Sequence, residues 1–426
     1  MYLGIDFGTS GCRAIIIDEQ DNPVAEVSYP LPSPKVNGRH VTQHADVWIS
    51  GLHRLFKALA AESDLSLIKR IAIDGTSASL LMTDENGLPL TPALMYNDSS
   101  SYDEVLLIKH HCPTSEHLCM TATSSLAKAI QLMEHQKGQT VIFLHQADYL
   151  TNYLCDDWDN SDYHNALKLG FDVKTGQWPE WIFKLIPEAC LPKVFSPGEV
   201  IGRISTQISD DFGFSPDCEI CAGTTDANAA FIATGCQQLG DAVTSLGSTT
   251  VLKVLNLKPV HNLATGVYSH KLGDYWLCGG ASNAGAAILR QFFSDQELIE
   301  LSAQIDLQKP TALSYYPLPS PGERFPVNDP NKKPELEPRP ESDVDFLHGI
   351  LSALTQIEHQ GYEKLKQLGA SAPNRILSCG GGASNPIWLK MRNQLLGVPV
   401  LRARQTQAAY GSALLAKQGL SKYIRT

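Results

Sequence analysis

The chain has 426 residues, and at roughly 100 to 200 residues per domain this length predicts two domains. Hydrophobic residues make up 43% and charged residues 19%, a balance that excludes wholesale disorder. The formal net charge is −11 and no basic stripe offsets it, which argues against nucleic acid and anionic membranes as partners.

The first half of the chain alternates predicted strands and helices. Two short β-type runs joined by a glycine-rich turn begin it, and apolar residues then recur at helical spacing from Val47 to Leu59. Such alternation is typical of an α/β domain with helices packed on a mixed sheet. We predict strands at 3–6, 14–18, 24–29, 71–73 and 141–144, and helices at 45–62, 124–135 and 146–154.

The second half contains a proline-rich stretch. Nine prolines fall between Pro310 and Pro340, where no regular element persists, so we expect an ordered excursion or a linker. An α/β pattern follows it. We predict helices at 343–368, 385–396 and 408–417, and a strand at 376–378.

The N-terminal segment has no basic region followed by an apolar stretch, and no apolar run reaches the roughly 18 residues of a membrane span. We therefore expect a cytoplasmic protein. The ten cysteines are scattered along the chain, which predicts buried, reduced thiols. Only Cys218 and Cys221 have a suggestive spacing, but on a strand they point to opposite faces and make a poor metal pair.

Two turns are similar across the halves of the chain. Ile5–Ser10 and Thr244–Thr249 each end a strand with a glycine followed by small hydroxyl residues, and an apolar strand follows each. Glycine and serine are common in turns, which explains either turn alone. As a pair, the turns predict duplicated domains that face one ligand.

Turns of this kind suit a phosphate group. Glycine removes the Cβ that keeps an anion away, so successive backbone N–H groups can point at phosphate oxygens. Neither turn matches the P-loop or the dinucleotide-binding fingerprint. A third glycine cluster, Cys379–Asn385, lies between a predicted strand and a predicted helix and suits a nucleotide.

Two carboxylates are placed for phosphoryl transfer, which needs a cation near the phosphates and a base for the acceptor hydroxyl. Asp6 ends a strand just before the first turn and is suited to hold Mg²⁺ through water. Asp226 stands where an apolar strand changes into an alanine-rich helix. An Asp at such a place is also a common helix N-cap, and the local sequence leaves both interpretations open.

Motifs over nearly the whole chain resemble those of the FGGY carbohydrate kinases, members of the actin, hexokinase and heat-shock chaperone superfamily. The matching segments, in the family's order, are Gly4–Ser10 with Arg13 and Asp18, Gln43–Trp48, Ala222–Asp226, Leu246–Thr249, Gly322–Arg324 with Pro326, Asp329 and Pro330, Gly380–Trp388 and Gly411–Ala413. The resemblance implies an α/β fold of two actin-like (ribonuclease H-like) ATPase domains around a central cleft. Residues 1–234, completed by a C-terminal helix at 407–426, would bind the sugar and supply the base. Residues 235–406 would bind the nucleotide.

The resemblance also implies roles for single residues. Asp226 would accept the proton of a sugar hydroxyl, while Asp6 and Thr9 would organise Mg²⁺ and the transferring phosphate. The implied cofactors are ATP and Mg²⁺. Further contacts with ATP are implied for Gly8, Thr9, Ser10, Gly11, Arg13, Gly247, Ser248, Thr249, Gly381, Gly382, Asn385 and Trp388. For Trp388 core packing is the favoured alternative, because one aromatic at helical spacing is more often structural.

The segment Asp74–Ser79 has small hydroxyl residues where many sugar kinases of the family have a bulky Gln-Met-His type segment. Together with Met95–Asp98, Ser124–Lys128 and Gly279–Gly285, it resembles the short plant and cyanobacterial D-ribulose kinases once labelled xylulose-kinase-like. This similarity narrows the implied substrate to a ketopentose.

Four residues are implied as sugar contacts: Thr76, Ser77, Asp98 and Asp226. The structural alternative for the first two is a turn-capping pair. Two positions depart from the family pattern, since Ser100 stands where Arg is usual and Gln407 stands where a Glu commonly begins the closing helix. The first departure bears on substrate orientation rather than on phosphate chemistry.

We therefore expect an ATP-dependent kinase that phosphorylates the terminal hydroxyl of a ketopentose, D-ribulose first and D-xylulose as the alternative. Its partners would be a small sugar and ATP, and the oligomeric state is left open. A non-catalytic, nucleotide-gated sugar-binding protein is a second class, because the ATP clamp alone does not specify sugar transfer.

Overall fold

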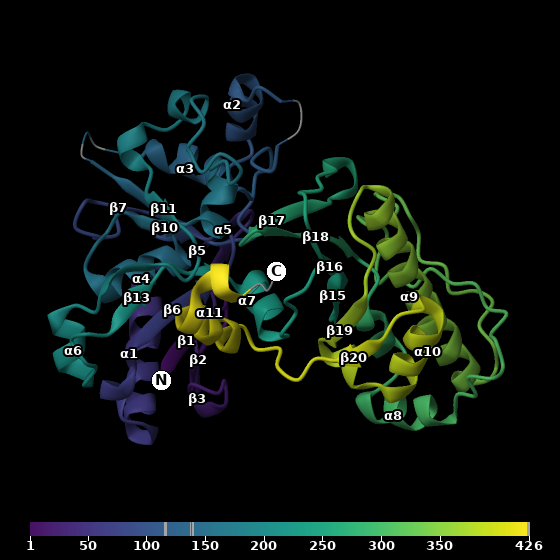
Figure 1. The fold of residues 1–426 in the computed structure, drawn as a ribbon. Coiled ribbons are helices and arrows are strands. Elements are labelled where there is room, and N and C mark those ends of the chain that lie inside the picture. The colour runs from purple at the N-terminus through teal and green to yellow at the C-terminus, as the bar shows by residue number, and fades with distance from the viewer. Residues whose placement is uncertain (115–116, 137, 139, 424–426) are drawn as a thin grey trace. The chain divides into compact units, whose positions relative to one another are not determined.

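The computed structural model describes residues 1–114, 117–136, 138 and 140–423, and the chain divides into two compact units (Figure 1). Unit 1 comprises Met1–Ala233 and Gln407–Tyr423, and unit 2 comprises Thr234–Thr406. Residues 424–426, the end of the predicted closing helix, lie outside the described residues. Each unit contains a mixed sheet with helices, so the predicted α/β fold is confirmed.

A mixed sheet forms the centre of unit 1, with strands in the order β12-β13-β6-β1-β2-β3 and β14 paired to β6. Strand β1 (Tyr2–Phe7) pairs antiparallel with β2 (Gly11–Ile17) and parallel with β6 (Arg70–Gly75). The other strands of this sheet are β3 (Pro23–Pro30), β12 (Val200–Arg203), β13 (Glu219–Cys221) and β14 (Thr224–Thr225).

The predicted helix at 45–62 is confirmed as α1 (Ala45–Glu62). Its apolar residues recur at helical spacing and pack with alternate residues of β1 in one buried cluster, because side chains on a strand alternate between its faces. The contributing residues include Leu3, Ile5 and Phe7 from β1, and Trp48, Leu52, Leu55 and Phe56 from α1.

Further elements of unit 1 form a second sheet in the order β4-β5-β8-β7-β9, a strand pair and several helices. The strands are β4 (Lys35–Asn37), β5 (His40–Gln43), β7 (Leu80–Thr83), β8 (Ala93–Leu94), β9 (Ile142–His145), β10 (Asn160–Asp162) and β11 (Lys193–Phe195). The helices are α2 (Glu104–His111), α3 (Ser125–Met133), α4 (Gln146–Cys155), α5 (Tyr163–Ala166), α6 (Thr206–Phe212) and α7 (Asp226–Ala233).

Helix α11 (Ala408–Tyr423) belongs to unit 1 and packs beside β1, β6 and α7 (Figure 1). The approach to α7 is close enough to require glycine at Gly411, where a Cβ would lie 1.9 Å from the Ala229 carbonyl oxygen. The closing helix is therefore fitted backbone to backbone against the element that begins with Asp226.

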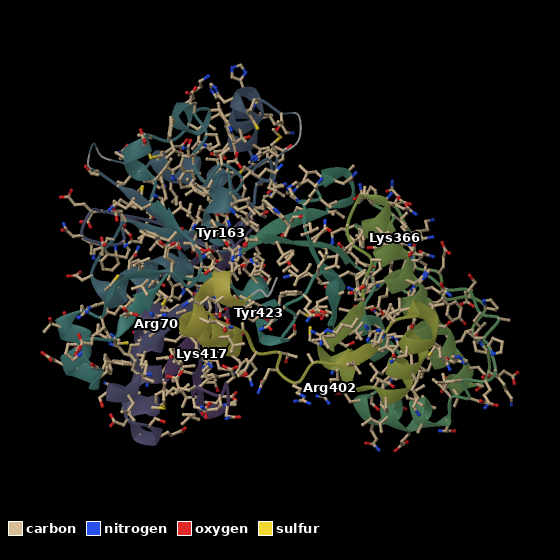
Figure 2. All side chains as sticks on the ribbon, in the orientation of Figure 1. Arg70, Tyr163, Lys366, Arg402, Lys417 and Tyr423 are labelled. Atoms are coloured by element: carbon tan, nitrogen blue, oxygen red, sulfur yellow. The ribbon has the colours of Figure 1, made fainter. Side chains whose placement is uncertain are left out.

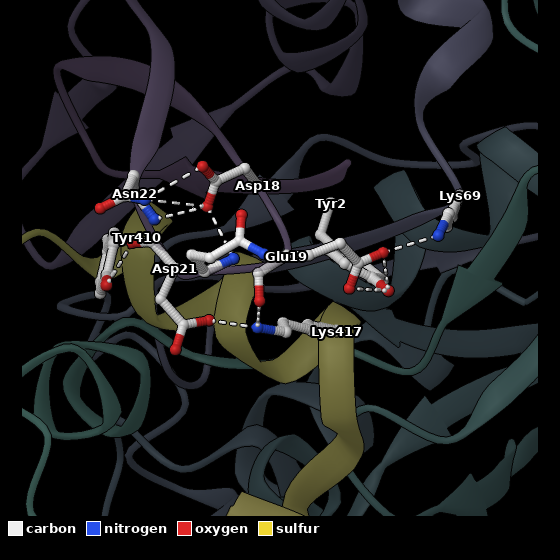
Figure 3. Close-up of polar contacts among 9 residues, drawn as sticks. Tyr2, Asp18, Glu19, Asp21, Asn22, Lys69, Tyr410 and Lys417 are labelled. Atoms are coloured by element: carbon white, nitrogen blue, oxygen red, sulfur yellow. Dashed lines mark hydrogen bonds and ion pairs between the residues drawn. The ribbon is translucent and has the colours of Figure 1, made fainter.

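Polar contacts also fasten α11 to the turn between β2 and β3 (Figure 3). Lys417, labelled on this helix in Figure 2, donates from Nζ to the Glu19 carbonyl and to the Asp21 carboxylate, both at 2.6 Å. Tyr410 Oη donates to the Asp21 carbonyl at 2.9 Å. These bonds attach the last described element to the first hairpin of the chain.

The sheet of unit 2 has the order β17-β18-β16-β15-β19-β20. Strand β15 (Asp241–Leu246) pairs antiparallel with β16 (Thr250–Asn256) and parallel with β19 (Arg375–Cys379). The first strand of the hairpin in each unit thus has a parallel neighbour on its other side, and the two similar turns occupy the same topological position. The remaining elements are β17 (Tyr268–Leu272), β18 (Tyr275–Ser282), β20 (Val400–Arg402), α8 (Asp295–Gln304), α9 (Asp343–Gln367) and α10 (Pro386–Leu396).

The proline-rich stretch from 310 to 340 contains no helix or longer strand, but isolated bridges join Tyr316 to Glu335 and Glu323 to Asp329. Glu323 is buried and accepts hydrogen bonds from Ser282 Oγ at 2.6 Å and from the Asn283 backbone N–H at 2.7 Å. Of the two predicted alternatives, the stretch is the ordered excursion.

All ten cysteines are free thiols, and burial raises the pKa of both Cys218 and Cys221 to about 12. Such thiols are neutral at physiological pH, as expected for core cysteines. Among the helices that the structure describes, none is long and apolar enough to cross a bilayer.

Candidate active site

Three aspartates lie at the carboxyl ends of neighbouring parallel strands in unit 1. Asp6 on β1 is paired opposite Asp74 on β6, and Asp74 is paired opposite Thr224 on β14, two residues before Asp226. Parallel strands end at the same edge of a sheet, which is where ligands bind in open α/β sheets. Asp6 and Asp226, both predicted from the sequence, are therefore brought to one edge with Asp74 between them.

Asp74 is a candidate that the sequence analysis missed, since it was named only within a segment of small residues. The side chain is fully buried, accepts a hydrogen bond from Ser412 Oγ of α11 at 2.7 Å, and is hydrogen-bonded to the side chain of Asp6. Burial and then the negative charge of Asp6 raise the pKa of Asp74 well above its usual range, and Asp226 adds to the effect. The available signal was a carboxylate at the end of an apolar run, Ile71–Ile73.

Asp6 is partly buried, and this burial raises its pKa, whereas the hydrogen bond with Asp74 and the charge of Arg13 lower it. Because Asp74 is the more deeply buried and has no cation beside it, we assign the shared proton to Asp74 and the negative charge to Asp6. An ionised Asp6 is the form that a metal cation or its water shell requires.

The first glycine turn closes directly after Asp6. The Gly8 backbone N–H donates to the Gly11 carbonyl at 3.0 Å, and Thr9 and Ser10 lie partly or fully exposed at its tip. Arg13, opposite Asp6 in the hairpin register, has Nε 3.6 Å from the Glu26 carboxylate. The structure thus presents the turn residues to solvent, as an anion-binding turn requires, and the Asp6 carboxylate precedes them in the chain.

The fit of the site to Mg²⁺ depends on its donor set. Within the described ranges, no group of three or more His, Cys, Asp or Glu side chains is placed to hold a metal ion. Mg²⁺ commonly keeps several waters and binds through one or two carboxylates plus substrate phosphates. Asp6 fits that pattern, in which the ion is held jointly by the protein and a nucleotide.

Asp226 begins α7 directly after β14, at the predicted change from strand to helix. Its side chain is partly exposed, and Oδ1 accepts a hydrogen bond from the Ala227 backbone N–H at 2.6 Å. This bond goes to the adjacent residue, whereas an N-cap side chain bonds the second or third N–H of its helix, so both interpretations of the carboxylate stay open. Because it is not buried, this contact does not prevent it from taking a proton from a ligand hydroxyl.

Thr76 and Ser77 follow β6 but differ in their contacts. Thr76 is buried, and its backbone N–H and Oγ1 donate to Gln146 Oε1 at 3.0 and 2.8 Å, which ties it to a distant segment rather than capping its own turn. Ser77 Oγ is buried and has no hydrogen-bond partner among the residues described. An unsatisfied buried hydroxyl is uncommon, so Ser77 is the stronger candidate for a ligand contact.

Asp98 lies fully buried between β5 and the turn that contains it. One carboxylate oxygen accepts from the Val41 backbone N–H at 2.6 Å, and the other accepts from Ser100, from its N–H at 3.0 Å and from Oγ at 2.6 Å. This geometry favours a structural role, and the predicted sugar contact of Asp98 gains no support from it. Ser100, the departure from the family pattern, is one of the donors.

Lys128 on α3 is a second residue whose importance was missed. It is fully buried, and Nζ donates to the carbonyls of Ala78 and Met95, both at 2.7 Å. Burial lowers the pKa of Lys128 to about 7, although the charge of Asp98 opposes this shift. Lys128 therefore connects the turn after β6, in which Ala78 has a φ of +71°, to the turn before Asp98.

In unit 2 the second glycine turn and the third glycine cluster line one pocket. Strands β15 and β19 are parallel, with Ser245 opposite Cys379, so both segments follow neighbouring strand ends. The pocket has a volume of about 840 Å³, within the range of small-molecule sites. The predicted nucleotide contacts that line it are Gly247, Ser248, Gly381, Gly382, Asn385 and Trp388, whereas Thr249 does not.

Trp388 is both a core residue and a wall of this pocket. It is 1% exposed, and its indole Nε1 donates to Thr355 Oγ1 at 3.0 Å, as the structural alternative predicted. Gly382 allows the glycine cluster to approach the ring, because a Cβ there would lie 2.5 Å from a ring carbon of Trp388. Asn385 caps α10, with Oδ1 accepting from the backbone N–H groups of Ile387 and Trp388.

Family models match most of the chain. The N-terminal domain of the FGGY family of carbohydrate kinases matches residues 1–233, and its C-terminal domain matches residues 242–418. The chain belongs to the FGGY family of carbohydrate kinases. It is therefore a phosphotransferase that acts on a sugar hydroxyl, and the sequence prediction of the family and of enzyme activity is confirmed.

Relatives of this kinase align along its full length. It is 27% identical to a xylulose kinase of Haemophilus influenzae, over 98% of this chain and 90% of the relative, and 23% identical to a xylulose kinase of Staphylococcus epidermidis, over 99% and 88%. Among solved structures, the xylulose kinase of Rhodospirillum rubrum matches with a TM-score of 0.86 at 19% identity, covering 98% of this chain and 89% of that one. The glycerol kinase of Plasmodium falciparum with ADP matches with a TM-score of 0.84 at 17% identity, covering 97% and 88%.

The structural matches confirm the two-domain fold of FGGY sugar kinases for this chain. The predicted D-ribulose kinase subgroup is a finer statement than family membership, and it stays a prediction.

Proposed function

We propose that this carbohydrate kinase transfers the γ-phosphoryl group of ATP to the terminal primary hydroxyl of a ketopentose, most readily D-ribulose, to give D-ribulose 5-phosphate. The observation on which the proposal depends is the strand edge of unit 1, where Asp226 lies with Asp6, Asp74 and the unsatisfied hydroxyl of Ser77. One strand edge would thereby supply three groups: Asp226 as the proton acceptor, the Ser77 hydroxyl for the sugar, and the Asp6 carboxylate for a metal cation.

Each residue then has a defined task. Asp226 accepts the proton of the sugar hydroxyl while the hydroxyl oxygen attacks the γ-phosphorus of ATP. Ser77 hydrogen-bonds the sugar. Asp6 would hold Mg²⁺ through water, and Thr9 lies on the turn that would meet the phosphate. When bound, Mg²⁺ offsets negative charge on the polyphosphate.

The nucleotide is assigned to the pocket of unit 2. Gly247 and Ser248 would meet its phosphates, and Gly381, Gly382 and Trp388 would contain its base. The ADP-bound structure of the Plasmodium falciparum glycerol kinase supports the use of an adenine nucleotide.

D-xylulose is the alternative substrate. The relatives in Haemophilus influenzae and Staphylococcus epidermidis are named xylulose kinases, which favours it, whereas the similarity of the segment Asp74–Ser79 to D-ribulose kinases favours D-ribulose. Both are ketopentoses with a terminal primary hydroxyl, so the chemistry assigned to Asp226 is the same. Membership of a kinase family argues against the non-catalytic binding protein.

The test of the base is Asp226→Asn, assayed with ATP, Mg²⁺ and D-ribulose. Loss of a general base should lower kcat by about 10² to 10⁴. The matched control is Asp210→Asn, which removes an exposed carboxylate of unit 1 and should leave kcat unchanged. Near-normal turnover of the Asp226 variant would show that the base lies elsewhere.

The test of the substrate is a comparison of kcat/KM for D-ribulose, D-xylulose and glycerol. D-ribulose should give the highest value. If D-xylulose exceeds it, the alternative is correct, and if no polyol is phosphorylated, the proposed function is wrong.

A further inference from the structure

We propose that the buried ion pair between Arg392 and Glu358 positions the helical wall of the unit 2 pocket, so that these two residues set the affinity for the nucleotide without touching it. The inference rests on the proposed function, because it takes this pocket to be the nucleotide site. Neither residue lines the pocket, so both are positioning residues.

The ion pair joins helices α9 and α10 of unit 2. Arg392 on α10 is fully buried, and Glu358 on α9 is 1% exposed. Arg392 Nε donates to Glu358 Oε2 at 2.6 Å, and Nη2 donates to Oε1 at 2.7 Å. Because two parallel bonds join a planar guanidinium to a planar carboxylate, this contact fixes orientation as well as distance.

The same ion pair is bonded to the two strands that carry the glycine segments. Arg392 Nη1 donates to Ser378 Oγ on β19 at 2.6 Å, and Thr244 Oγ1 on β15 donates to Glu358 Oε1 at 2.5 Å. Thr244 and Ser378 lie directly opposite each other in the parallel ladder. Each is followed, three residues later, by a glycine that lines the pocket. The ion pair is therefore attached to both strands just before the segments that form the pocket.

The strand ladder fixes β15 against β19, but it does not fix α10. This helix supplies Ile387 and Trp388 to the pocket, and Arg392 lies about one helical turn beyond Trp388. The Trp388 indole Nε1 is itself bonded to α9, through Thr355 Oγ1 at 3.0 Å. The fork of Arg392 joins this wall to β19 directly and to β15 through Glu358.

The fit between α10 and the glycine segments is close. A Cβ at Gly382 would lie 2.5 Å from a ring carbon of Trp388, and a Cβ at Gly380 would lie 2.7 Å from the carbonyl carbon of Leu246. Glycine segments have wide conformational freedom and no side chains that hold them in place. A small shift of α10 would therefore alter the space for a nucleotide, and a misplacement of about 1 Å can lower activity by about 10²-fold.

Stability alone does not account for the ion pair. Taking a carboxylate and a guanidinium out of water is unfavourable, and replacing a buried ion pair by apolar residues of similar size is often neutral or stabilising. Removing only one partner leaves an uncompensated buried charge, so the pair has to be replaced as a unit. The geometry that the fork imposes is what an apolar pair would not reproduce.

The experiment combines Glu358→Leu with Arg392→Met and measures MgADP binding to the full-length chain by calorimetry. The dissociation constant should rise by about 10- to 100-fold, while the urea midpoint without nucleotide stays unchanged or rises. The KM for ATP should rise in the same variant, and the KM for the ketopentose should not. An unchanged dissociation constant, or equal rises of both KM values, would overturn the inference.

The matched control combines Glu363→Leu with Lys366→Met, an exposed pair on the same helix with Nζ and Oε1 3.6 Å apart, and should leave MgADP binding unchanged. Arg392→Lys keeps the charge beside Glu358 but loses the fork, so it should restore part of the affinity. If the double replacement lowers the urea midpoint, Arg392→Lys decides. Weaker binding at an unchanged midpoint supports the inference, whereas unchanged binding, or weaker binding only with a lowered midpoint, overturns it.

These outcomes are separate from those of the proposed function. If MgADP binds but no sugar is phosphorylated, the proposed function fails and the variants still decide the inference. If MgADP does not bind the natural chain, the pocket is not a nucleotide site and the inference is wrong whatever the turnover.

Discussion

Asp74 illustrates how burial alters a carboxylate beside an active-site candidate. It lies next to Asp6, and it accepts a hydrogen bond from the Ser412 hydroxyl. No cation contributes to the shift of its pKa. Two ionised carboxylates in contact inside a protein repel each other, so one keeps its proton. A neutral Asp74 leaves the negative charge of the pair on Asp6.

This protonation gives stability a pH dependence of known sign. With a folded-state pKa raised above the ordinary value of 3.8, Asp74 keeps its proton where the unfolded chain has lost it. The contribution of Asp74 to the free energy of unfolding is fully present below the unfolded-state pKa. It is lost as pH rises toward the folded-state pKa, by up to about 1.4 kcal/mol per pH unit. Asp74→Asn removes this loss, because the amide carries no charge and still accepts from Ser412.

We expect Asp74→Asn to be more stable than the natural chain at pH 7, with the difference shrinking toward pH 4. Urea unfolding at several pH values measures it. Asp210→Asn, at an exposed site, should show no such difference. A gap that is constant with pH, or a less stable variant at pH 7, would contradict the assigned protonation.

Ser77 and Ser79 form a matched pair of hydroxyls in one turn. Ser77→Ala should raise the KM for the sugar by up to about tenfold at unchanged thermal stability, since Ser77 Oγ makes no bond within the described protein. Ser79→Ala should instead lose about 1 kcal/mol of stability, because its Oγ contacts Thr76 Oγ1 at 2.6 Å and accepts from the Tyr96 N–H at 2.9 Å. An unchanged sugar KM in the Ser77 variant would remove it from the site.

At the scale of elements, α3 connects two turns of unit 1 through Lys128. The Lys128 amine donates to two carbonyl oxygens in different turns. Burial lowers its pKa to about 7, because desolvation disfavours the charged ammonium form. A buried lysine that holds backbone rather than a carboxylate acts as a positioning residue for the turn that contains Ser77.

Lys128→Met should raise the KM for the sugar and leave the KM for ATP unchanged, because the two carbonyls it holds both belong to unit 1. Two buried carbonyls would lose their donor, so a loss of about 2 kcal/mol in stability is also expected. Lys109→Met, at an exposed lysine of α2, is the control and should change neither. Equal shifts in both KM values would point to general damage rather than positioning.

At the scale of the whole molecule, the units repeat one topology with different side chains at the strand ends. Unit 1 places carboxylates there, and unit 2 places glycines beside an apolar pocket. The same backbone arrangement thus presents carboxylates in one unit and a pocket with glycines and apolar side chains in the other.

Nucleotide binding should therefore be independent of Asp226, the proposed base. MgADP at 100 times its dissociation constant should stabilise the chain by about 2.7 kcal/mol. The same stabilisation is expected for Asp226→Asn, because the pocket lies within unit 2. A thermal-shift titration checks this, and loss of the shift in the variant would place Asp226 in the nucleotide site.

Long periodic elements were predicted well. Helix α1 has the predicted bounds, and the helix predicted at 343–368 is α9. Short strands such as β7 and β8 were missed, because a few apolar residues have no distinct period and pair only with segments distant in sequence. The closing helix was predicted to end at 417, and the helical backbone of α11 is interrupted soon after, at Gly419 with φ +64° and ψ 166°, before a further short helical stretch ends at Tyr423.

The sequence by itself determined the alternation of elements, the glycine turns and the candidate aspartates at 6 and 226, since these depend on local spacing and residue type. Only the tertiary structure decided that Asp74 is buried against Asp6, that Asp98 is enclosed by backbone donors, and that Ser77 alone in its turn lacks a partner. The physical reason is that burial and hydrogen-bond satisfaction are set by segments far apart in the chain, such as α11 with its Ser412, and no local pattern encodes which side chains those segments will enclose.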